Sequence, residues 1–192
     1  MAKKIALFAS GKGTNAKAIY SYFKQSPDIT VGAVCSNSLS GEVLRFAKKN
    51  NVPSFFLANG SQKTFKSLAS FLKKEGVDYL VLAGFLLKVP GFIIASYQHK
   101  IINIHPSLLP KYGGKGMYGK NVHSAVINNN DAYSGITIHY VNEHYDDGAV
   151  IFQYPYKRKR GETVESLEKA IQKIEHNYFS LVLEKIIKSP LS

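Results

Sequence analysis

The chain has 192 residues, of which 45% are hydrophobic, a length and composition that predict a single domain over residues 1–192. It contains no apolar run of about 18 residues and no signal-peptide pattern, so we expect a cytoplasmic protein with no membrane segment. The net charge of +12 favours anionic ligands, such as phosphorylated metabolites, polyglutamylated cofactors, nucleic acid or a membrane surface.

The first predicted strand, residues 4–10 (KIALFAS), is almost wholly apolar, as in a parallel strand buried on both faces. It runs into a glycine loop, and apolar residues recur at helical spacing after it. This order is typical of phosphate binding, because exposed N–H groups and the positive end of a helix favour an anion. The loop lacks the full glycine pattern of dinucleotide-binding and P-loop proteins, so a tight turn with glycines for geometry alone remains the alternative.

Strands and helices then alternate along the chain. Apolar runs predict strands at 28–36, 52–57, 77–83 and 100–105, and helical spacing predicts helices at 41–50 and 61–75 and a short one ending at 97. This alternation predicts an α/β fold with a doubly wound, mainly parallel sheet and helices on both faces. Ligands bind beyond the carboxyl ends of such strands, where loops 11–14, 84–89 and 105–116 are expected to meet.

The remaining segments extend the same fold. A glycine-rich, mobile loop is expected at 111–119, followed by a helix at 123–130 and a strand at 134–141. An acidic turn at 142–148 leads into a strand at 149–156 and a long helix at 163–188. Alternation along 134–141 places Thr137 and His139 on one polar face.

The strand at 100–105 ends by presenting Asn103 and His105 on one face, because successive side chains of a strand alternate. Ile102 and Ile104 take the other face, and Pro106 ends strand pairing because it has no amide proton. A polar strand edge facing water explains the pair equally well on local grounds. The expected position beside the glycine loop favours a functional site.

The turn Tyr145-Asp146-Asp147-Gly148 offers a carboxylate partner for His105. Such a partner orients the imidazole for proton transfer, and Asn103 is placed to donate a hydrogen bond to an oxyanion. Neither Ser107 nor Cys35 lies in a nucleophile-elbow context. The pattern therefore indicates acyl transfer or hydrolysis without a covalent enzyme intermediate, with aspartates that merely form a turn as the alternative.

Two other ligand classes are not expected. The chain has six histidines but no His-Glu-x-x-His or paired-cysteine spacing, so we expect no metal site. The one dense basic run, 157–160 (KRKR), lies where a predicted strand turns into a loop. We therefore do not expect nucleic acid as a partner, and a basic nucleic-acid-binding α/β module stands as the non-enzymatic alternative.

Five ordered motifs resemble the phosphoribosylglycinamide formyltransferase family, folate-dependent enzymes of purine synthesis. The motifs are residues 10–15 (SGKGTN), 83–85 (AGF), 103–112 (NIHPSLLPKY), 146–148 (DDG) before a hydrophobic strand, and 175–176 (EH). The resemblance covers residues 4 to about 187 and implies the Rossmann-like fold of formyltransferases. It also implies transfer of the formyl group of 10-formyltetrahydrofolate, as co-substrate, to the amine of glycinamide ribonucleotide.

The resemblance implies a catalytic trio at the matching positions. Asn103 would stabilise the tetrahedral oxyanion, and His105, oriented by Asp146, would move the proton from the attacking amine toward folate N10. Where many relatives have Asp-Gly-Gly, this chain has Asp146, Asp147 and Gly148. Asp146 is the expected partner because it keeps the spacing to Gly148.

The resemblance also implies which residues bind the substrates. The substrate phosphate is expected at Gly11, Lys12, Gly13, Thr14 and Asn15, and the ribose and glycinamide at Ser107, Gln172 and Glu175. The folate is expected along Leu86, Leu87, Lys88 and Val89 and along Asn142, Glu143, His144, Tyr145 and Asp146. Many relatives have Met-Arg-Ile-Leu at 86–89, so a folate contact through that arginine side chain is not expected here, whereas backbone contacts are.

Two related enzymes carry additional domains. A methionyl-tRNA formyltransferase would add an RNA-binding domain after the catalytic one, and a formyltetrahydrofolate deformylase would add a domain before it. Neither extension fits within 192 residues. We therefore expect a transferase acting on small molecules, as a monomer or homodimer, with formyltetrahydrofolate hydrolysis as the enzymatic alternative.

Overall fold

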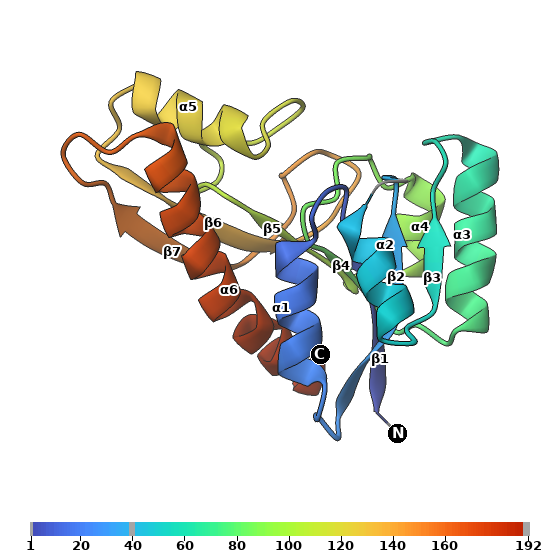
Figure 1. The fold of residues 1–192 in the computed structure, drawn as a ribbon. Coiled ribbons are helices and arrows are strands. Elements are labelled where there is room, and N and C mark those ends of the chain that lie inside the picture. The colour runs from blue at the N-terminus through green and yellow to red at the C-terminus, as the bar shows by residue number, and fades with distance from the viewer. Residues whose placement is uncertain (1, 39–40, 190–192) are drawn as a thin grey trace.

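The computed structural model describes residues 2–38 and 41–189, and seven strands within them form one sheet (Figure 1). The strands are β1 (Lys3–Phe8), β2 (Ile29–Ser36), β3 (Ser54–Phe56), β4 (Tyr79–Leu82), β5 (Ile101–His105), β6 (Tyr133–Tyr140) and β7 (Val150–Lys157). Their order in the sheet is β3-β2-β1-β4-β5-β6-β7. The first five strands pair in parallel, whereas β6 runs antiparallel to both β5 and β7. The predicted mainly parallel sheet is confirmed, with an antiparallel extension at one edge.

Helices cover both faces of this sheet. They are α1 (Thr14–Phe23), α2 (Glu42–Lys49), α3 (Gln62–Lys74), α4 (Gly91–Ser96), α5 (Lys120–Asn128) and α6 (Val164–Lys188). One apolar cluster joins the sheet to α1, α2, α5 and α6, and Ile19 and Leu183 are among its members. The other joins the opposite face to α3 and α4 and contains Leu68 and Ile93. The sheet is therefore doubly wound, as expected.

β1 shows why the central strands are apolar. Ile5 and Leu7 belong to one cluster, whereas Ala6 and Phe8 belong to the other. All four side chains are buried because helices cover both faces of the strand. The apolar run that predicted this strand thus reflects its position between two helical layers.

Helix ends follow local signals at α3 but not at α5. The Oγ of Ser61 accepts the N–H of Thr64 at the start of α3, and Gly76 adopts a φ of 66° just beyond its end. The predicted start of α5 at residue 123 is wrong, because the helix begins at Lys120 directly after Gly119. His123 therefore lies in the first turn of α5.

None of the helices in the described part of the chain is both long and apolar enough to cross a bilayer. Cys35 is fully buried in β2, and burial raises the pKa of its thiol. A buried thiol that stays protonated is a poor nucleophile. Cys35 is thus a small apolar core residue.

Candidate active site

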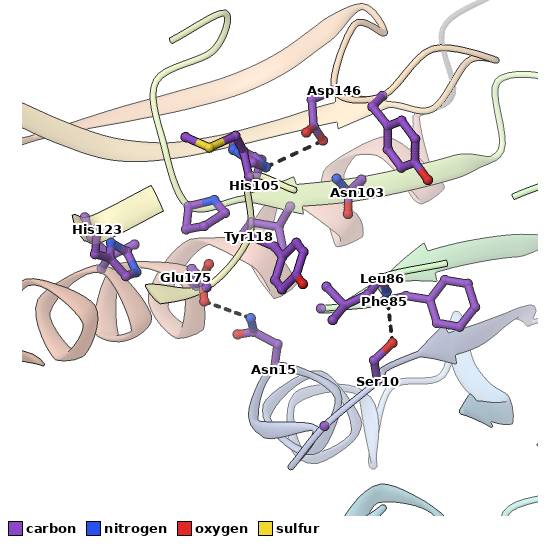
Figure 2. A pocket seen from close by; sticks show the side chains of 18 of the residues that line it. Ser10, Asn15, Phe85, Leu86, Asn103, His105, Tyr118, His123, Asp146 and Glu175 are labelled. Carbon is purple, nitrogen blue, oxygen red and sulfur yellow. Dashed lines mark hydrogen bonds and ion pairs between the residues drawn. The ribbon is translucent and has the colours of Figure 1, made fainter. Parts of the chain in front are cut away.

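A cavity of about 610 Å³ lies at the carboxyl ends of β1, β4 and β5. Its walls come from the loops after these strands, from segment 114–119 and from one face of α6 (Figure 2). Gly11, Gly84 and His105 line it together, so the three loops that were expected to meet at this edge do so. A cavity of this size accommodates a small-molecule ligand. We call it the main cavity.

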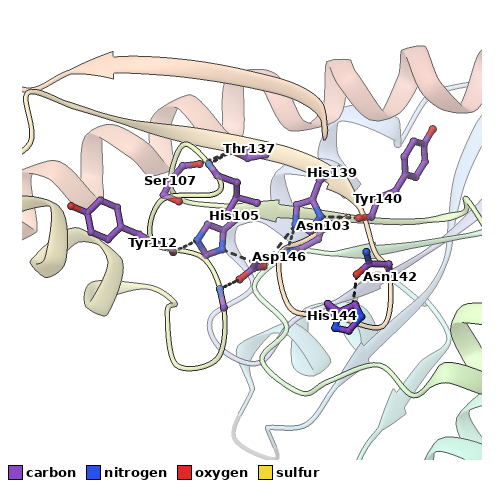
Figure 3. Close-up of polar contacts among 12 residues, drawn as sticks. Asn103, His105, Ser107, Tyr112, Thr137, His139, Tyr140, Asn142, His144 and Asp146 are labelled. Atoms are coloured by element: carbon purple, nitrogen blue, oxygen red, sulfur yellow. Dashed lines mark hydrogen bonds and ion pairs between the residues drawn. The ribbon is translucent and has the colours of Figure 1, made fainter. Parts of the chain in front are cut away.

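Asn103 is held in one orientation by a histidine on the neighbouring strand. Its Nδ2 lies 3.1 Å from Nε2 of His139, and Nδ1 of His139 lies 2.8 Å from the carbonyl oxygen of Tyr140 (Figure 3). A carbonyl oxygen only accepts, so Nδ1 of His139 carries a proton. Burial lowers the pKa of His139, which keeps the ring neutral and leaves Nε2 as an acceptor. Asn103 therefore donates to His139, and its amide lines the main cavity in a fixed position.

His105 contacts protein groups through both ring nitrogens. Nε2 lies 2.7 Å from the carbonyl oxygen of Tyr112 and must donate to it, while Nδ1 lies 3.5 Å from Oδ1 of Asp146. The side chains of His105 and Asp146 are only 5% and 11% exposed. A proton taken up at Nδ1 thus faces a carboxylate in a site with little water, which is the arrangement of an oriented acid–base pair.

The backbone of the acidic turn directs Asp146 toward His105. Asp146 adopts a φ of 54°, which is uncommon for a residue with a side chain, and its Oδ2 accepts the N–H of Gly114 at 2.9 Å. A Cβ at Gly148 would overlap the carbonyl oxygen of Tyr140, so this position requires glycine. Asp147 is exposed, and its carboxylate lies 3.4 Å from Nδ2 of Asn142. The structure therefore places Asp146, and not Asp147, beside the imidazole.

The glycine loop enters α1 through a left-handed residue. Gly13 is the N-cap of α1 with a φ of 65°, and a Cβ there would lie 2.6 Å from Cγ2 of Val43. A side chain is therefore excluded by both conformation and space. Of the five residues predicted in this loop, Gly11 and Asn15 line the main cavity. Thr14 instead accepts a hydrogen bond from Gln172 on α6, at 3.0 Å.

Glu175 and Asn15 form a hydrogen-bonded pair in the cavity wall between α6 and α1. Nδ2 of Asn15 donates to Oε2 of Glu175 at 2.9 Å, while Oδ1 of Asn15 is buried and has no partner among the described residues. Burial raises the pKa of Glu175 to about 7, although the hydrogen bond from Asn15 lowers it. Gln172 lines the same wall. Three of the residues expected to bind the ribonucleotide thus lie together.

The hydroxyl group of Ser107 lies outside the main cavity. Ser107 is buried, and its Oγ donates to the carbonyl oxygen of Lys111 at 2.6 Å. Its side chain lines a neighbouring cavity of about 260 Å³ behind the Asn-His strand end. Any substrate contact at this position is therefore expected from the backbone and not from the hydroxyl.

The two segments expected to bind folate enclose a smaller cavity of about 70 Å³. This cavity shares Asn103 and Asp146 with the main cavity, so the two spaces adjoin at these two residues. It is also lined by Leu87, Lys88, Val89, Asn142, His144 and Tyr145. Leu86 lines the main cavity instead. Glu143 turns away, with its carboxylate close to Gly91 at the start of α4.

The segments on either side of the smaller cavity contact each other directly. Nζ of Lys88 lies 5.7 Å from the ring centroid of Tyr145, a cation–π contact. Ser10 joins the glycine loop to the first of these segments, because its Oγ accepts the N–H of Leu86 at 2.9 Å. The loops of the site thus hold one another through side chains as well as through the sheet.

Sequence reasoning assigned no site role to two histidines. His139 lies directly opposite Asn103 in the antiparallel register of β5 and β6. The alternation in 134–141 placed His139 on a polar face, and only the strand pairing shows which residue it contacts. His123 lines the main cavity from α5 and was missed because the helix was predicted to begin later.

No group of three or more histidine, cysteine or acidic side chains in residues 2–38 and 41–189 is arranged to hold a metal ion. Nδ1 of His105 and Nε2 of His139 lie 3.5 and 3.8 Å from Oδ1 of Asp146. The polar groups of the site suit proton transfer and oxyanion binding.

Comparison with known proteins gives a family for this arrangement. A family model described as Formyl transferase matches residues 3–183. The phosphoribosylglycinamide formyltransferase of Bacillus subtilis is 31% identical over 96% of this chain and 95% of its own length. The chloroplastic phosphoribosylglycinamide formyltransferase of Vigna unguiculata is 36% identical over 96% of this chain. The chain spans 61% of the length of the Vigna protein and 65% of its Arabidopsis thaliana counterpart.

Solved structures agree with this result. The phosphoribosylglycinamide formyltransferase of Bacillus halodurans matches with a TM-score of 0.88 and 32% identity, over 98% of this chain and 97% of that one. A formyltetrahydrofolate deformylase of Pseudomonas syringae matches with a TM-score of 0.85 over 98% of this chain and 62% of that one, but at 21% identity it shares the fold alone. The chain therefore belongs to the formyl transferase family, among the phosphoribosylglycinamide formyltransferases.

Proposed function

We propose that the protein transfers the formyl group of 10-formyltetrahydrofolate to the amine of glycinamide ribonucleotide. The observation that carries the proposal is the position of Asn103, His105 and Asp146. They lie where the main cavity, with its glycine loop, adjoins the smaller cavity between the two folate segments. A site with this arrangement can bind the formyl acceptor in one cavity and the formyl donor in the other, with the acid–base pair between them.

The chemical step follows from the groups in place. The amine nitrogen attacks the formyl carbon, and the electron pair of the carbonyl bond moves to oxygen, giving a tetrahedral oxyanion. Asn103 donates its second amide proton to that oxyanion, because the first is already bonded to His139. The electron pair of the oxyanion then re-forms the carbonyl bond while the bond between carbon and folate N10 breaks, and the electron pair of that bond stays on N10.

A proton must move from the attacking amine to N10 during this step. His105 takes up the amine proton at Nδ1 and returns it to N10, and Asp146 stabilises the imidazolium in between. Nε2 stays bonded to Tyr112, so the ring presents the same nitrogen throughout. The transfer needs no covalent enzyme intermediate, and we propose no metal for it.

The two substrates take different sides of the trio. The ribonucleotide would place its phosphate at the N–H groups of the glycine loop, at the start of α1. Its ribose and glycinamide would lie along Asn15, Gln172 and Glu175, which line the main cavity. The folate would lie between the segments joined by Lys88 and Tyr145, and it acts as a co-substrate that is consumed. Residues with no side chain in either cavity, such as Ser107 and Lys12, would contribute through the backbone.

The similarity to named formyltransferases supports these substrates, because the Bacillus subtilis relative matches over nearly its whole length. A single domain over residues 1–192, a cytoplasmic location and a monomer or homodimer stay predictions from the sequence. The basic run near the end of β7 gives little support to a nucleic-acid surface, since Arg158 donates to the carbonyl oxygen of Asp131 and to Oδ1 of Asn130.

An assay of 10-formyltetrahydrofolate consumption tests the proposal. With and without glycinamide ribonucleotide, the protein is expected to consume the donor only when the amine is present and to give equal amounts of formylated product. Donor consumption with formate release and no need for amine would show a hydrolase instead. Absence of both reactions, with salt-dependent binding to arbitrary DNA that His105→Ala leaves unchanged, would overturn the proposal in favour of a nucleic-acid-binding protein.

A further inference from the structure

His123 is a buried polar side chain in the main cavity for which the proposed reaction has no use. It lies in the first turn of α5, is 3% exposed and lines the cavity together with Glu175 on α6. Figure 2 shows Glu175 between His123 and Asn15, so the three form a row along the wall opposite β5. We call this row, Asn15, Glu175 and His123, the helix side of the cavity.

The two nitrogens of His123 have different surroundings. Nδ1 is sealed from solvent and has no hydrogen-bond partner among the described residues. Nε2 forms no hydrogen bond within the described part of the chain and is not sealed, so it is the nitrogen with access to the cavity. A sealed N–H without a partner is rarer than an unpaired acceptor in folded proteins. The proton of the neutral ring is therefore assigned to Nε2.

The ring stays neutral at ordinary pH. Burial, together with a smaller contribution from the nearby His105, lowers the pKa of His123 to about 4. A neutral ring of this tautomer has one fixed donor, and this donor points at the space that a ligand would fill. It is poorly suited to act as a second acid beside His105, because it does not carry the extra proton near neutral pH.

We propose that His123 is a further substrate-binding residue, whose Nε2–H donates to an acceptor oxygen on the ribosyl-glycinamide part of the amine substrate. This inference rests on the proposed function. The row on the helix side begins at the glycine loop, where the phosphate is expected, and ends at His123, so the oxygen lies beyond the phosphate along the ribonucleotide. Asn15 and Glu175, which line the cavity in the same row, give this wall further polar side chains.

Two substitutions at one position separate hydrogen bonding from packing. His123→Leu fills similar space without a donor, whereas His123→Gln places an amide N–H close to the position of Nε2. We expect His123→Leu to raise the KM for glycinamide ribonucleotide by about 3–10-fold, the value of one neutral hydrogen bond, with kcat and the KM for the formyl donor nearly unchanged. His123→Gln is expected to recover most of the loss. His99→Asn removes an exposed imidazole and serves as the control.

Three kinetic outcomes overturn the proposal. An unchanged KM in His123→Leu would show that the imidazole does not bind the substrate. An equal loss in the Leu and Gln variants, with both folded, would show that only the shape of the ring matters. A loss confined to kcat would assign His123 to the chemical step.

A second measurement does not depend on turnover. Long-range ¹H–¹⁵N NMR spectra of the wild-type protein distinguish a protonated ring nitrogen from an unprotonated one, and we expect the proton of His123 on Nε2. Titration with glycinamide ribonucleotide, without the formyl donor, is expected to shift the Nε2 signal more than the Nδ1 signal. A proton on Nδ1, or no shift at saturating ribonucleotide, would overturn the assignment.

The two measurements also separate this inference from the proposed function. If the wild type binds the ribonucleotide and shifts the Nε2 signal but does not consume the formyl donor, the proposed reaction fails and the His123 contact stands. If the wild type shows amine-dependent transfer while His123→Leu keeps its KM, the contact fails and the reaction stands.

Discussion

The two sides of the main cavity differ in how their polar side chains are paired. On the side formed by β5, β6 and the acidic turn, Asn103, His105, His139 and Asp146 each contact another polar group of the protein. On the helix side, one nitrogen of His123 and one oxygen of Asn15 are sealed without partners. These contacts hold the side chains of this side, which we call the strand side, in place before a ligand binds, as groups for oxyanion binding and proton transfer require. At His123, the helix side also keeps an unpaired nitrogen, Nε2, that has access to the cavity and is free to bind a ligand.

The largest expected effect comes from breaking the strand side at its carboxylate. Asp146→Asn keeps the shape of the side chain but removes the charge that faces Nδ1 of His105. We expect kcat for formyl transfer to fall by about 10²–10⁴-fold, the range of an acid–base contribution. Asp147→Asn, at the exposed neighbouring position, is expected to keep the wild-type rate. Equal losses in both variants would contradict the pairing of His105 with Asp146.

Removing the oxyanion donor is the next largest change. Asn103→Ala is expected to lower kcat by about 10²–10³-fold while the KM for glycinamide ribonucleotide changes little, because the lost hydrogen bond strengthens only in the transition state. Steady-state assays with both substrates varied measure the two constants. Asn128→Ala, on the exposed end of α5, is the control. Turnover near the wild-type value in Asn103→Ala would remove Asn103 from the mechanism.

The helix side is tested through stability, because Glu175 is held there with a pKa of about 7 against an ordinary value of 4.5. Between these pH values the folded protein keeps a proton that the unfolded chain has lost, so the contribution of Glu175 to the free energy of unfolding falls as pH rises. We expect the free energy of unfolding of Glu175→Gln to rise by about 3 kcal/mol relative to that of the wild type between pH 4.5 and pH 8.

Urea unfolding of the wild type and Glu175→Gln at both pH values measures this difference. His123 and His139 have lowered pKa values, which destabilise the folded state at acid pH in both proteins. This contribution cancels in the difference between the two free energies of unfolding, so the difference reports on Glu175. Glu168→Gln, further along the same face of α6, is the control. A constant difference between Glu175→Gln and wild type at all pH values would show that Glu175 is ionised in the folded protein.

The smallest effect concerns the residue that orients the oxyanion donor. His139→Leu is expected to lower kcat about tenfold, because Asn103 loses one neutral hydrogen bond and its amide is free to rotate. His139→Gln offers a carbonyl oxygen near the position of Nε2 and is expected to restore most of the rate. If both variants lose the same activity, His139 serves packing and not the orientation of Asn103.

The sequence predicted the strand that carries Asn103 and His105 but not the positions of His139 and His123. Both of these positions depend on features that local patterns do not determine. Local patterns predicted the apolar strand that ends in Asn103 and His105, since burial on both faces and a following proline leave clear signals. The contact between Asn103 and His139 depends on the register of two antiparallel strands, which alternation within one strand does not determine. The role of His123 depended on a helix start that has no side-chain cap, so composition placed it too late.

The acidic turn shows the same limit at the level of one residue. Spacing to Gly148 favoured Asp146, but what directs its carboxylate inward is a left-handed backbone conformation that no local signal demands of an aspartate. The expected role of Ser107 came from the resemblance alone, and the hydroxyl is committed to the carbonyl oxygen of Lys111. Residue type alone therefore predicts poorly the roles of Asp146 and Ser107, because backbone conformation directs the first side chain and a backbone carbonyl oxygen binds the second.

Asp146 also accepts the N–H of Gly114, and His105 donates to the carbonyl oxygen of Tyr112, so both members of the acid–base pair hold the base of the glycine-rich loop. The loop and the acid–base pair therefore form one structural unit, because a change in the loop backbone at Tyr112 or Gly114 moves a hydrogen-bond partner of the pair.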